Sequence, residues 1–134
     1  MKIFLDTNIL FSAILFPGST PDLALQKALS ISNKVFTSDY CLKELSDRFA
    51  EKFPDKIESL RLFFTTLLFH IQLVKTTDLV FDEEENVRDL KDRPVLRAAL
   101  QCEAEILITG DKDLLDAKVT KIKIIKASDY YSNY

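Results

Sequence analysis

The sequence predicts an α/β fold with three layers, in which helices cover both faces of a central parallel sheet of about five strands. Two observations support this prediction. Short apolar runs at residues 3–5, 35–37, 71–74, 106–109 and 122–125 alternate with longer segments in which apolar residues follow helical spacing. Acidic residues directly follow two of these runs, after Leu5 and after Gly110, as expected at one edge of a parallel sheet.

The length and composition are those of one ordinary globular domain over residues 1–134. The chain has 134 residues, of which 47% are hydrophobic and 29% charged, enough to form a core without disulfides or a structural metal. Its two cysteines, Cys41 and Cys102, are far apart and are interpreted as core-facing thiols. No apolar stretch is long enough to span a membrane and no signal-peptide pattern is present, so we expect a cytoplasmic location.

The first three helices are predicted from their start and stop signals. After the strand at residues 3–5, a helix is expected from near Asn8 to Pro17-Gly18. A second helix begins at Thr20-Pro21, where threonine can cap and proline fits the first turn. Ser38 follows the second strand and is expected to cap a third helix that ends before Pro54.

A fourth helix is predicted over residues 60–71, directly before the third strand. Its apolar positions follow helical spacing and form one core stripe: Leu60, Phe63, Phe64, Leu67, Leu68 and Ile71. Leu62 and Phe69 fall on another face of the same helix, which indicates either a second packing surface or a homodimer contact. His70, the single histidine, is interpreted as a structural side chain on this apolar helix.

The second half of the chain contains an acidic segment, a fifth helix and two further strands. Residues 82–86 are interpreted as a solvated acidic turn or short helix on the surface. The fifth helix follows Asp92, has Pro94 in its first turn and directs apolar residues of 95–100 inward. Residues 121–126 partly alternate lysine with isoleucine, which is typical of an edge strand with one face in water.

The acids that follow the strands indicate a divalent cation. Asp6 follows the first strand, and Asp111 and Asp113 follow the fourth through Gly110. Two carboxylates about 4 Å apart repel by roughly 4 kcal/mol at an effective dielectric of 20. Several of them stay ionised together only when a metal or a shared proton intervenes. The net charge of −3 gives no basic excess, so binding to nucleic acid would depend on local cations.

Each acid also has a simpler explanation. Asp6 can cap the first helix, and the Gly110–Asp113 stretch can be an ordinary turn. Asp92 can cap the fifth helix or pair with its basic neighbours. Glu44 shares the polar side of its helix with Asp47 and Glu51, and helical spacing alone does not choose among them.

Four segments together resemble the PIN-domain family, in particular small prokaryotic PIN ribonucleases such as the VapC-like toxins. The segments are residues 4–8, 38–45, 89–96 and 108–115, so the resemblance covers nearly the whole chain. It implies a parallel sheet between helices and an acidic quartet around Mg²⁺ or Mn²⁺. The quartet would be Asp6, Glu44, Asp92 and Asp111, with Asn8, Thr109 and Asp113 as supporting groups.

One departure from the family pattern is visible. Relatives often have asparagine after the third acid, whereas Arg93-Pro94 follows Asp92 here. Arg93 either contacts a phosphate or forms an ion pair with Asp89. The other basic residues near the expected site, which could contact an RNA backbone, are Lys43, Arg48 and Lys112.

The sequence therefore predicts a metal-dependent endoribonuclease, which by the resemblance would be the toxin of a toxin–antitoxin pair with a small antitoxin partner. Hard oxygen ligands favour Mg²⁺ or Mn²⁺, and a bound cation would activate water for phosphodiester hydrolysis. Two alternatives stay open. One is a catalytically silent PIN-like module for RNA binding or assembly. The other is a metal-dependent phosphatase, although Asn8 stands where an aspartyl-phosphate enzyme would have its second aspartate.

Overall fold

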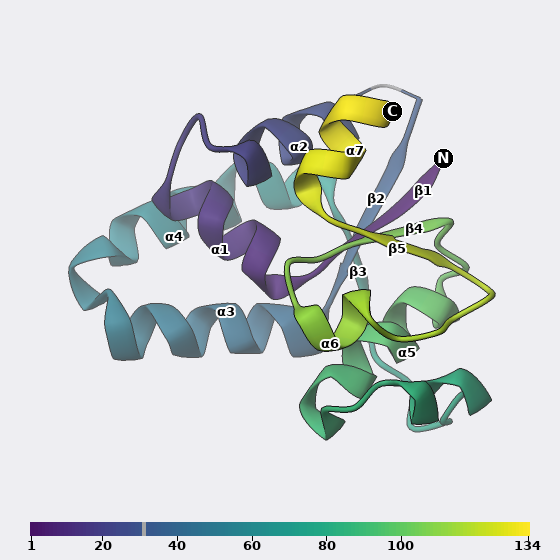
Figure 1. Ribbon diagram of the computed structural model, residues 1–134. Coiled ribbons are helices and arrows are strands. Elements are labelled where there is room, and N and C mark those ends of the chain that lie inside the picture. Colours follow the sequence, from purple (N-terminus) through teal and green to yellow (C-terminus); the bar gives the residue numbers. More distant parts are fainter. Residues whose placement is uncertain (31) are drawn as a thin grey trace.

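The computed structural model describes residues 1–30 and 32–134, and within them five parallel strands form one sheet. The strand order is β3-β2-β1-β4-β5, so β1 lies in the centre, and β5 is an edge strand as predicted for residues 121–126. The strands are β1 Lys2–Leu5, β2 Lys34–Ser38, β3 Gln72–Val74, β4 Ile106–Ile108 and β5 Lys123–Ile125. Helices lie on both sides of this sheet (Figure 1), which confirms the predicted three-layer α/β/α class.

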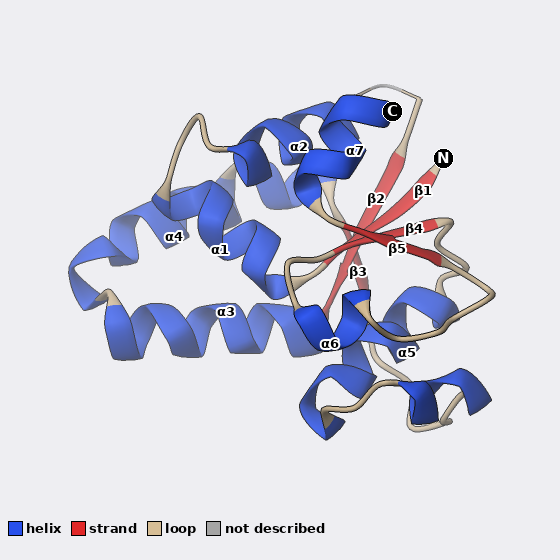
Figure 2. Cartoon of the chain, viewed as in Figure 1, coloured by secondary structure: helices blue, strands red, loops and turns tan. Residues whose placement is uncertain are grey.

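The helices of the described chain are α1 Thr7–Leu15, α2 Thr20–Ala28, α3 Asp39–Lys52, α4 Ile57–Thr65, α5 Arg93–Gln101, α6 Lys112–Leu115 and α7 Ala127–Asn133. Figure 2 shows α1, α2, α4 and α7 on one side of the strands and α5 and α6 on the other. Strand alternation separates two cores accordingly. Ile3 and Leu5 of β1 face α1–α4 and α7, whereas Phe4 faces α5 and α6.

Side-chain caps set the starts of the first three helices. Asp6 caps α1, since its carboxylate accepts from the Thr7 N–H at 2.7 Å. Ser38 caps α3 as predicted, with its hydroxyl accepting from the Cys41 N–H at 3.1 Å. The cap of α2 is Ser19 rather than Thr20, because the residue in extended conformation before the helix is the serine.

The predicted fourth helix over residues 60–71 is wrong in its second half. α4 begins at Ile57 and ends at Thr65, followed by a 3₁₀ turn, Leu67–His70, and then β3. The hydroxyls of Thr65 and Thr66 both donate to the Leu62 carbonyl, at 3.1 and 2.6 Å, which competes with continuation of the helix. The next residues must also extend to pair with β2.

The predicted core stripe of the fourth helix is confirmed only in part. Leu60, Phe63 and Ile71 are buried, Phe64 and Leu68 are partly buried, and the side chain of Leu67 lies outside the described part. Leu62 and Phe69 are 63% and 84% exposed, but they belong to different elements and do not form one helical face. His70 is exposed, so its interpretation as a residue packed on an apolar helix is wrong.

The acidic segment is also not simply a solvated surface. It forms a 3₁₀ turn, Asp82–Asn86, in which Glu84 is only 1% exposed. Arg97 of α5 donates from Nη2 and Nε to Glu84 Oε1 at 2.9 and 3.1 Å, and the Phe81 N–H donates to Oε2 at 2.7 Å. These donors match the buried charge, so Glu84 fastens the segment to α5.

The two cysteines differ in their environments. Cys41 is fully buried, as predicted, and burial raises the pKa of its thiol to about 12. Cys102 is only half-buried at the end of α5, where its thiol donates to the Ala99 carbonyl. Its prediction as a core-facing thiol therefore holds in part.

Candidate metal centre

Asp6 lies at the carboxyl edge of the sheet, between the ends of β1 and β4. Leu5 is in register with Ile108, so the residues after these two strands are neighbours. Asp6 is 4% exposed, and its two carboxylate oxygens accept from the Thr7 N–H and from the Thr109 hydroxyl, both at 2.7 Å. Asp6 thus caps α1 and also occupies the predicted position at the sheet edge.

The predicted supporting groups lie around this carboxylate. The Asn8 amide donates to Asp6 at 3.4 Å, and its oxygen accepts from the Gly110 N–H at 3.0 Å. The Thr109 hydroxyl that donates to Asp6 also accepts from the Asp111 N–H at 3.0 Å. These bonds connect the first helix to the turn after β4 and fix the separation of Asp6 and Asp111.

Burial and neighbouring negative charges hold protons on two of the acids. Burial raises the pKa of Asp6 to about 6 against the opposing bonds from Thr109 and Thr7, and the charges of Glu44 and Asp111 add to the rise. Burial likewise raises the pKa of Asp92 to about 7, followed by the charge of Asp111 and a proton that the two carboxyls can share. Asp6 and Asp92 are thus both affected by the charge of Asp111, and Asp6 also by that of Glu44, as expected if the four predicted acids lie near one another.

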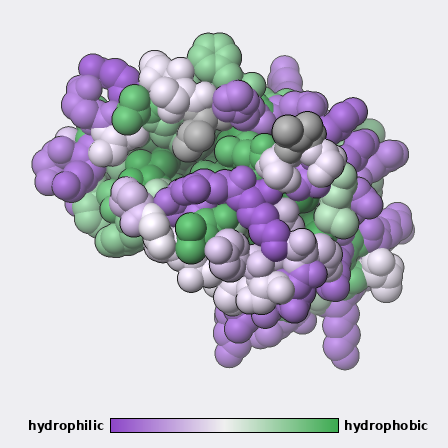
Figure 3. Space-filling model, turned by 90° about the horizontal axis from the view of Figure 1, so that it is seen from above, coloured by the Kyte–Doolittle hydropathy of each residue, from purple (hydrophilic) through white to green (hydrophobic). Residues whose placement is uncertain are grey.

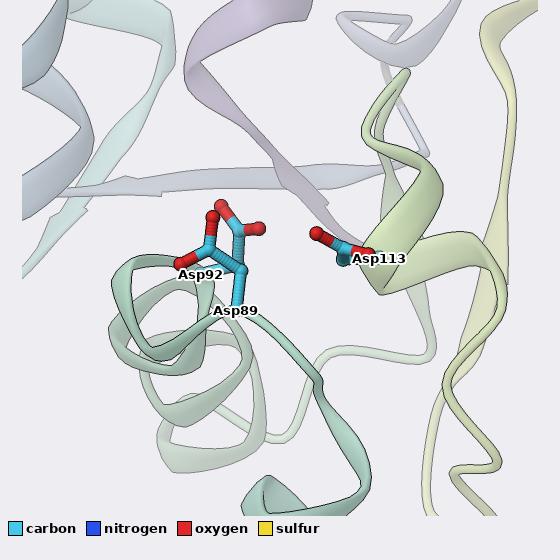
Figure 4. Close-up of side chains that lie close together, drawn as sticks. All are labelled: Asp89, Asp92 and Asp113. Carbon is cyan, nitrogen blue, oxygen red and sulfur yellow. The ribbon is translucent and has the colours of Figure 1, made fainter.

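The tightest group of carboxylates is a different set. One oxygen each from Asp89, Asp92 and Asp113 lies within 4.8 Å of the others. Figure 4 shows Asp89 and Asp92 on the same turn, with Asp113 facing them from the start of α6. Within the described residues, no three members of the quartet Asp6, Glu44, Asp92 and Asp111 meet this spacing, so Asp92 alone belongs to both sets.

Asp89 was missed as a site residue by the sequence analysis. The signal that could have identified it is its spacing from Asp92, because residues three apart in a 3₁₀ turn lie on the same side. The turn Leu90–Asp92 is of this type, and Asp89 caps it by accepting from the Lys91 N–H at 3.0 Å. The turn is attached to α3, since the Tyr40 hydroxyl donates to the Lys91 carbonyl at 2.6 Å.

The structure distinguishes Glu44 from the other acids of α3. Burial is the main cause that raises the pKa of Asp6 and of Tyr40, and the charge of Glu44 adds to both rises, so Glu44 lies close enough to act on the site. Asp47 instead forms a surface ion pair with Lys43 at 2.9 Å. Glu44 has a weaker contact of 3.5 Å with Arg48, one turn further along the helix.

Comparison with known proteins places the chain in a family. A sequence model described as PIN domain matches residues 2–113. This chain belongs to the PIN-domain family. Among solved structures, it is similar to a chain in the crystal structure of VapBC2 from Rickettsia felis bound to a DNA fragment from their promoter. The TM-score is 0.70 at 17% identity, over 94% of this chain and 98% of the other. A search of curated proteins finds no match.

The PIN domain contradicts one of the two contacts expected for Arg93. The prediction of an ion pair between Arg93 and Asp89 is wrong. Arg93 donates from Nε to the Val87 carbonyl at 3.0 Å and from Nη2 to the Glu85 carbonyl at 3.5 Å. Arg93, the first residue of α5, therefore holds the backbone of the segment that precedes Asp89. Lys112 lies exposed at the start of α6, whereas Arg88, which no sequence pattern singled out, donates to Asp113 at 2.9 Å.

The acids of this PIN domain fit a hard divalent cation. Asp92 Oδ2 is buried, and among the described residues no group donates a hydrogen bond to it. The side chain of Asp92 does not cap α5, so helix capping does not explain the position. A carboxylate oxygen without a partner costs free energy unless a cation or proton pairs with it. Aspartate oxygens are the ligands that Mg²⁺ and Mn²⁺ prefer, and nitrogen and sulfur donors are absent from the described cluster.

No helix in the described residues has the length and apolar character needed to cross a membrane.

Proposed function

We propose that this PIN domain is a metal-dependent endoribonuclease that hydrolyses RNA phosphodiester bonds. The observation that carries the proposal is the unpartnered, buried oxygen of Asp92 at the centre of a group of acids. These acids come from four distant parts of the chain, namely the ends of β1 and β4, α3 and the turn before α5. Such convergence on one sheet edge is typical of a catalytic site rather than of surface charge.

We assign the metal to the carboxylates around Asp92. Asp89 and Asp113 form the close trio with Asp92, Asp111 is its electrostatic partner, and Asp6 and Glu44 complete the site on the side of the sheet. When bound, Mg²⁺ or Mn²⁺ supplies a water of lowered pKa and offsets the charge that develops on the leaving oxygen. Thr7 and Thr109 hold Asp6 in one orientation, so its position is set before any ligand arrives.

The raised pKa values of Asp6 and Asp92 mean that metal binding must displace protons from these carboxyls. Asp6 and Asp92, with pKa values of about 6 and 7, hold protons in part near neutral pH. Metal binding requires the ionised carboxylates, so it releases these protons. Metal affinity should therefore rise between pH 5 and pH 8, together with activity.

We further propose that the protein acts as the toxin of a toxin–antitoxin pair in the cytoplasm. The family membership, the sequence resemblance to VapC-like toxins and the shared fold with a chain of a VapBC2 structure support this proposal. A small antitoxin would bind near the acidic site.

A homodimer contact through Leu62 and Phe69 stays a prediction. Both side chains are mostly exposed. Figure 3 shows apolar side chains exposed among hydrophilic ones on one face of the molecule.

The deciding experiment incubates the purified protein with a panel of cellular RNAs, with Mn²⁺ or with a chelator. We expect cleavage only with the metal, and Asp92→Asn should lower its rate by at least about a hundredfold because it removes a ligand shared by both acid sets. Asp47→Asn is the matched control, since Asp47 is an exposed acid on α3. Metal-dependent RNA binding without cleavage would identify a silent binding module instead, and turnover of small phosphate esters alone would identify a phosphatase.

A further inference from the structure

A cleft opens beside the candidate metal centre. Its volume is about 270 Å³, and its lining residues are Asn86, Arg88, Lys112, Asp113 and Asp116. Asp113 belongs both to this cleft and to the carboxylate group with Asp89 and Asp92. A chain that reaches the metal centre would therefore have room for its next unit in this cleft.

Arg88 is held at the rim of the cleft by Asp113. Its Nε donates to Asp113 Oδ1 at 2.9 Å, and the two side chains are 86% and 19% exposed. In the described part of the chain, neither terminal nitrogen of the guanidinium makes a hydrogen bond. Arg88 thus neutralises Asp113 with one donor while its other donors face solvent.

The same Asp113 oxygen cannot serve Arg88 and a cation equally well, because both compete for its negative charge. An exposed ion pair is weak, so Arg88 can be released at small cost. A guanidinium binds a phosphate through two parallel hydrogen bonds, which are stronger than a surface ion pair. Lys112, in the same lining, supplies a second positive charge.

We propose that this cleft is a binding subsite for an RNA backbone phosphate next to the scissile bond, and that Arg88 exchanges Asp113 for this phosphate when a divalent cation binds. The inference rests on the proposed nuclease function. Asp116 adds a negative charge to the lining, so the cleft attracts a phosphate only after a cation has neutralised the neighbouring aspartates. The contribution of Arg88 to RNA affinity is therefore metal-dependent.

The test compares Arg88→Gln with Arg61→Gln. Arg61 is also an exposed arginine in a surface ion pair, with Glu58 at 3.0 Å on α4, so the control has the same loss of charge. Titration calorimetry measures Mn²⁺ binding without RNA. Fluorescence anisotropy measures binding of a labelled single-stranded oligoribonucleotide of mixed sequence, in a chelator and in Ca²⁺, which takes the same oxygen ligands as Mg²⁺.

Loss of Arg88 should change the two affinities in opposite directions. Mn²⁺ should bind about two- to fivefold more tightly, because its competitor for Asp113 is gone. RNA in Ca²⁺ should bind about five- to tenfold more weakly, and the slope of log affinity against log salt should fall by about 0.7, the value for one phosphate contact on a single strand. In the chelator, RNA binding should match that of Arg61→Gln.

Three outcomes would overturn the inference. If Arg88→Gln matches Arg61→Gln in both assays while the wild-type protein cleaves RNA, the subsite is wrong and the nuclease function stands. If Arg88→Gln weakens Mn²⁺ binding, Arg88 supports the fold of the site rather than competing with the metal. A wild-type protein that neither binds nor cleaves RNA would overturn the subsite and the proposed function together.

Discussion

Replacement of Asp6 by asparagine should make the stability of the metal-free protein less dependent on pH. The pKa of Asp6 rises from 3.8 to about 6 on folding, mainly because the carboxylate is buried. This rise of about 2 units corresponds to about 3 kcal/mol, at 1.36 kcal/mol for each unit. Asparagine keeps an oxygen for the Thr7 N–H and has nearly the same shape, while its amide nitrogen can only donate, so the bond with the Thr109 hydroxyl must reverse its direction.

The sign follows from proton linkage. The folded protein holds the Asp6 proton more tightly than the unfolded chain, so the favourable contribution is complete below pH 3.8 and is lost as the pH rises through about 6. The assay is urea unfolding in a chelator at a series of pH values from 4 to 8. The free energy of unfolding of the wild-type protein should lose about 2 kcal/mol more than that of Asp6→Asn over this range, because part of the full contribution is already lost at pH 4.

A control fixes the interpretation. Asp55→Asn changes an exposed aspartate in the turn Pro54–Lys56 and should keep the wild-type dependence on pH. Some dependence should persist in Asp6→Asn between pH 4 and 7, since the pKa of Asp92 is raised to about 7. Identical pH profiles for the wild-type protein and Asp6→Asn would refute the argument that Asp6 is buried at a real energetic cost.

Two further predictions concern the metal and the segment that carries its ligands. Mn²⁺ should raise the melting temperature more at pH 8 than at pH 5.5, because protons on Asp6 and Asp92 compete with the cation at the lower pH. Differential scanning fluorimetry measures this shift, and an equal or larger shift at pH 5.5 would contradict the assigned ligands. Arg97→Met should destabilise the protein by about 3 kcal/mol, since it leaves the carboxylate of Glu84, 1% exposed, without its guanidinium. The double variant Glu84→Gln with Arg97→Met should recover part of this loss in urea unfolding, and two additive losses would argue against a coupled pair.

Local sequence signals determined the framework that positions the site. The apolar runs that became β1, β2, β4 and β5, together with Ser38 and Pro94 at helix starts, predicted the order of elements and hence the sheet edge. These signals are short-range, because a run of apolar residues or a capping side chain acts within a few positions. The family resemblance added the choice of Glu44 over its neighbours on α3, and that choice stays a prediction, with Asp47 engaged in a surface ion pair with Lys43.

Errors arose where a distant partner overrode a local signal. The break after Thr65 follows from the need of β3 to pair with β2, which no helical periodicity encodes. Glu84 lies in an acidic run that resembles a surface turn, yet Arg97, thirteen residues away, makes its burial possible. Likewise, Arg93 turns to backbone carbonyls of the preceding segment instead of Asp89.

By itself the sequence determined a parallel α/β sheet with aspartates at its carboxyl edge, since strand periodicity and turn residues are local properties. Only the tertiary structure decided which carboxylates meet, because the distances among Asp89, Asp92 and Asp113 depend on where the fold places the turn before α5 relative to α6. It also decided that Asp92 keeps an oxygen without a partner and that Arg88 pairs with Asp113. Such contacts join residues far apart in the chain, and their energies depend on burial that only the packed fold creates.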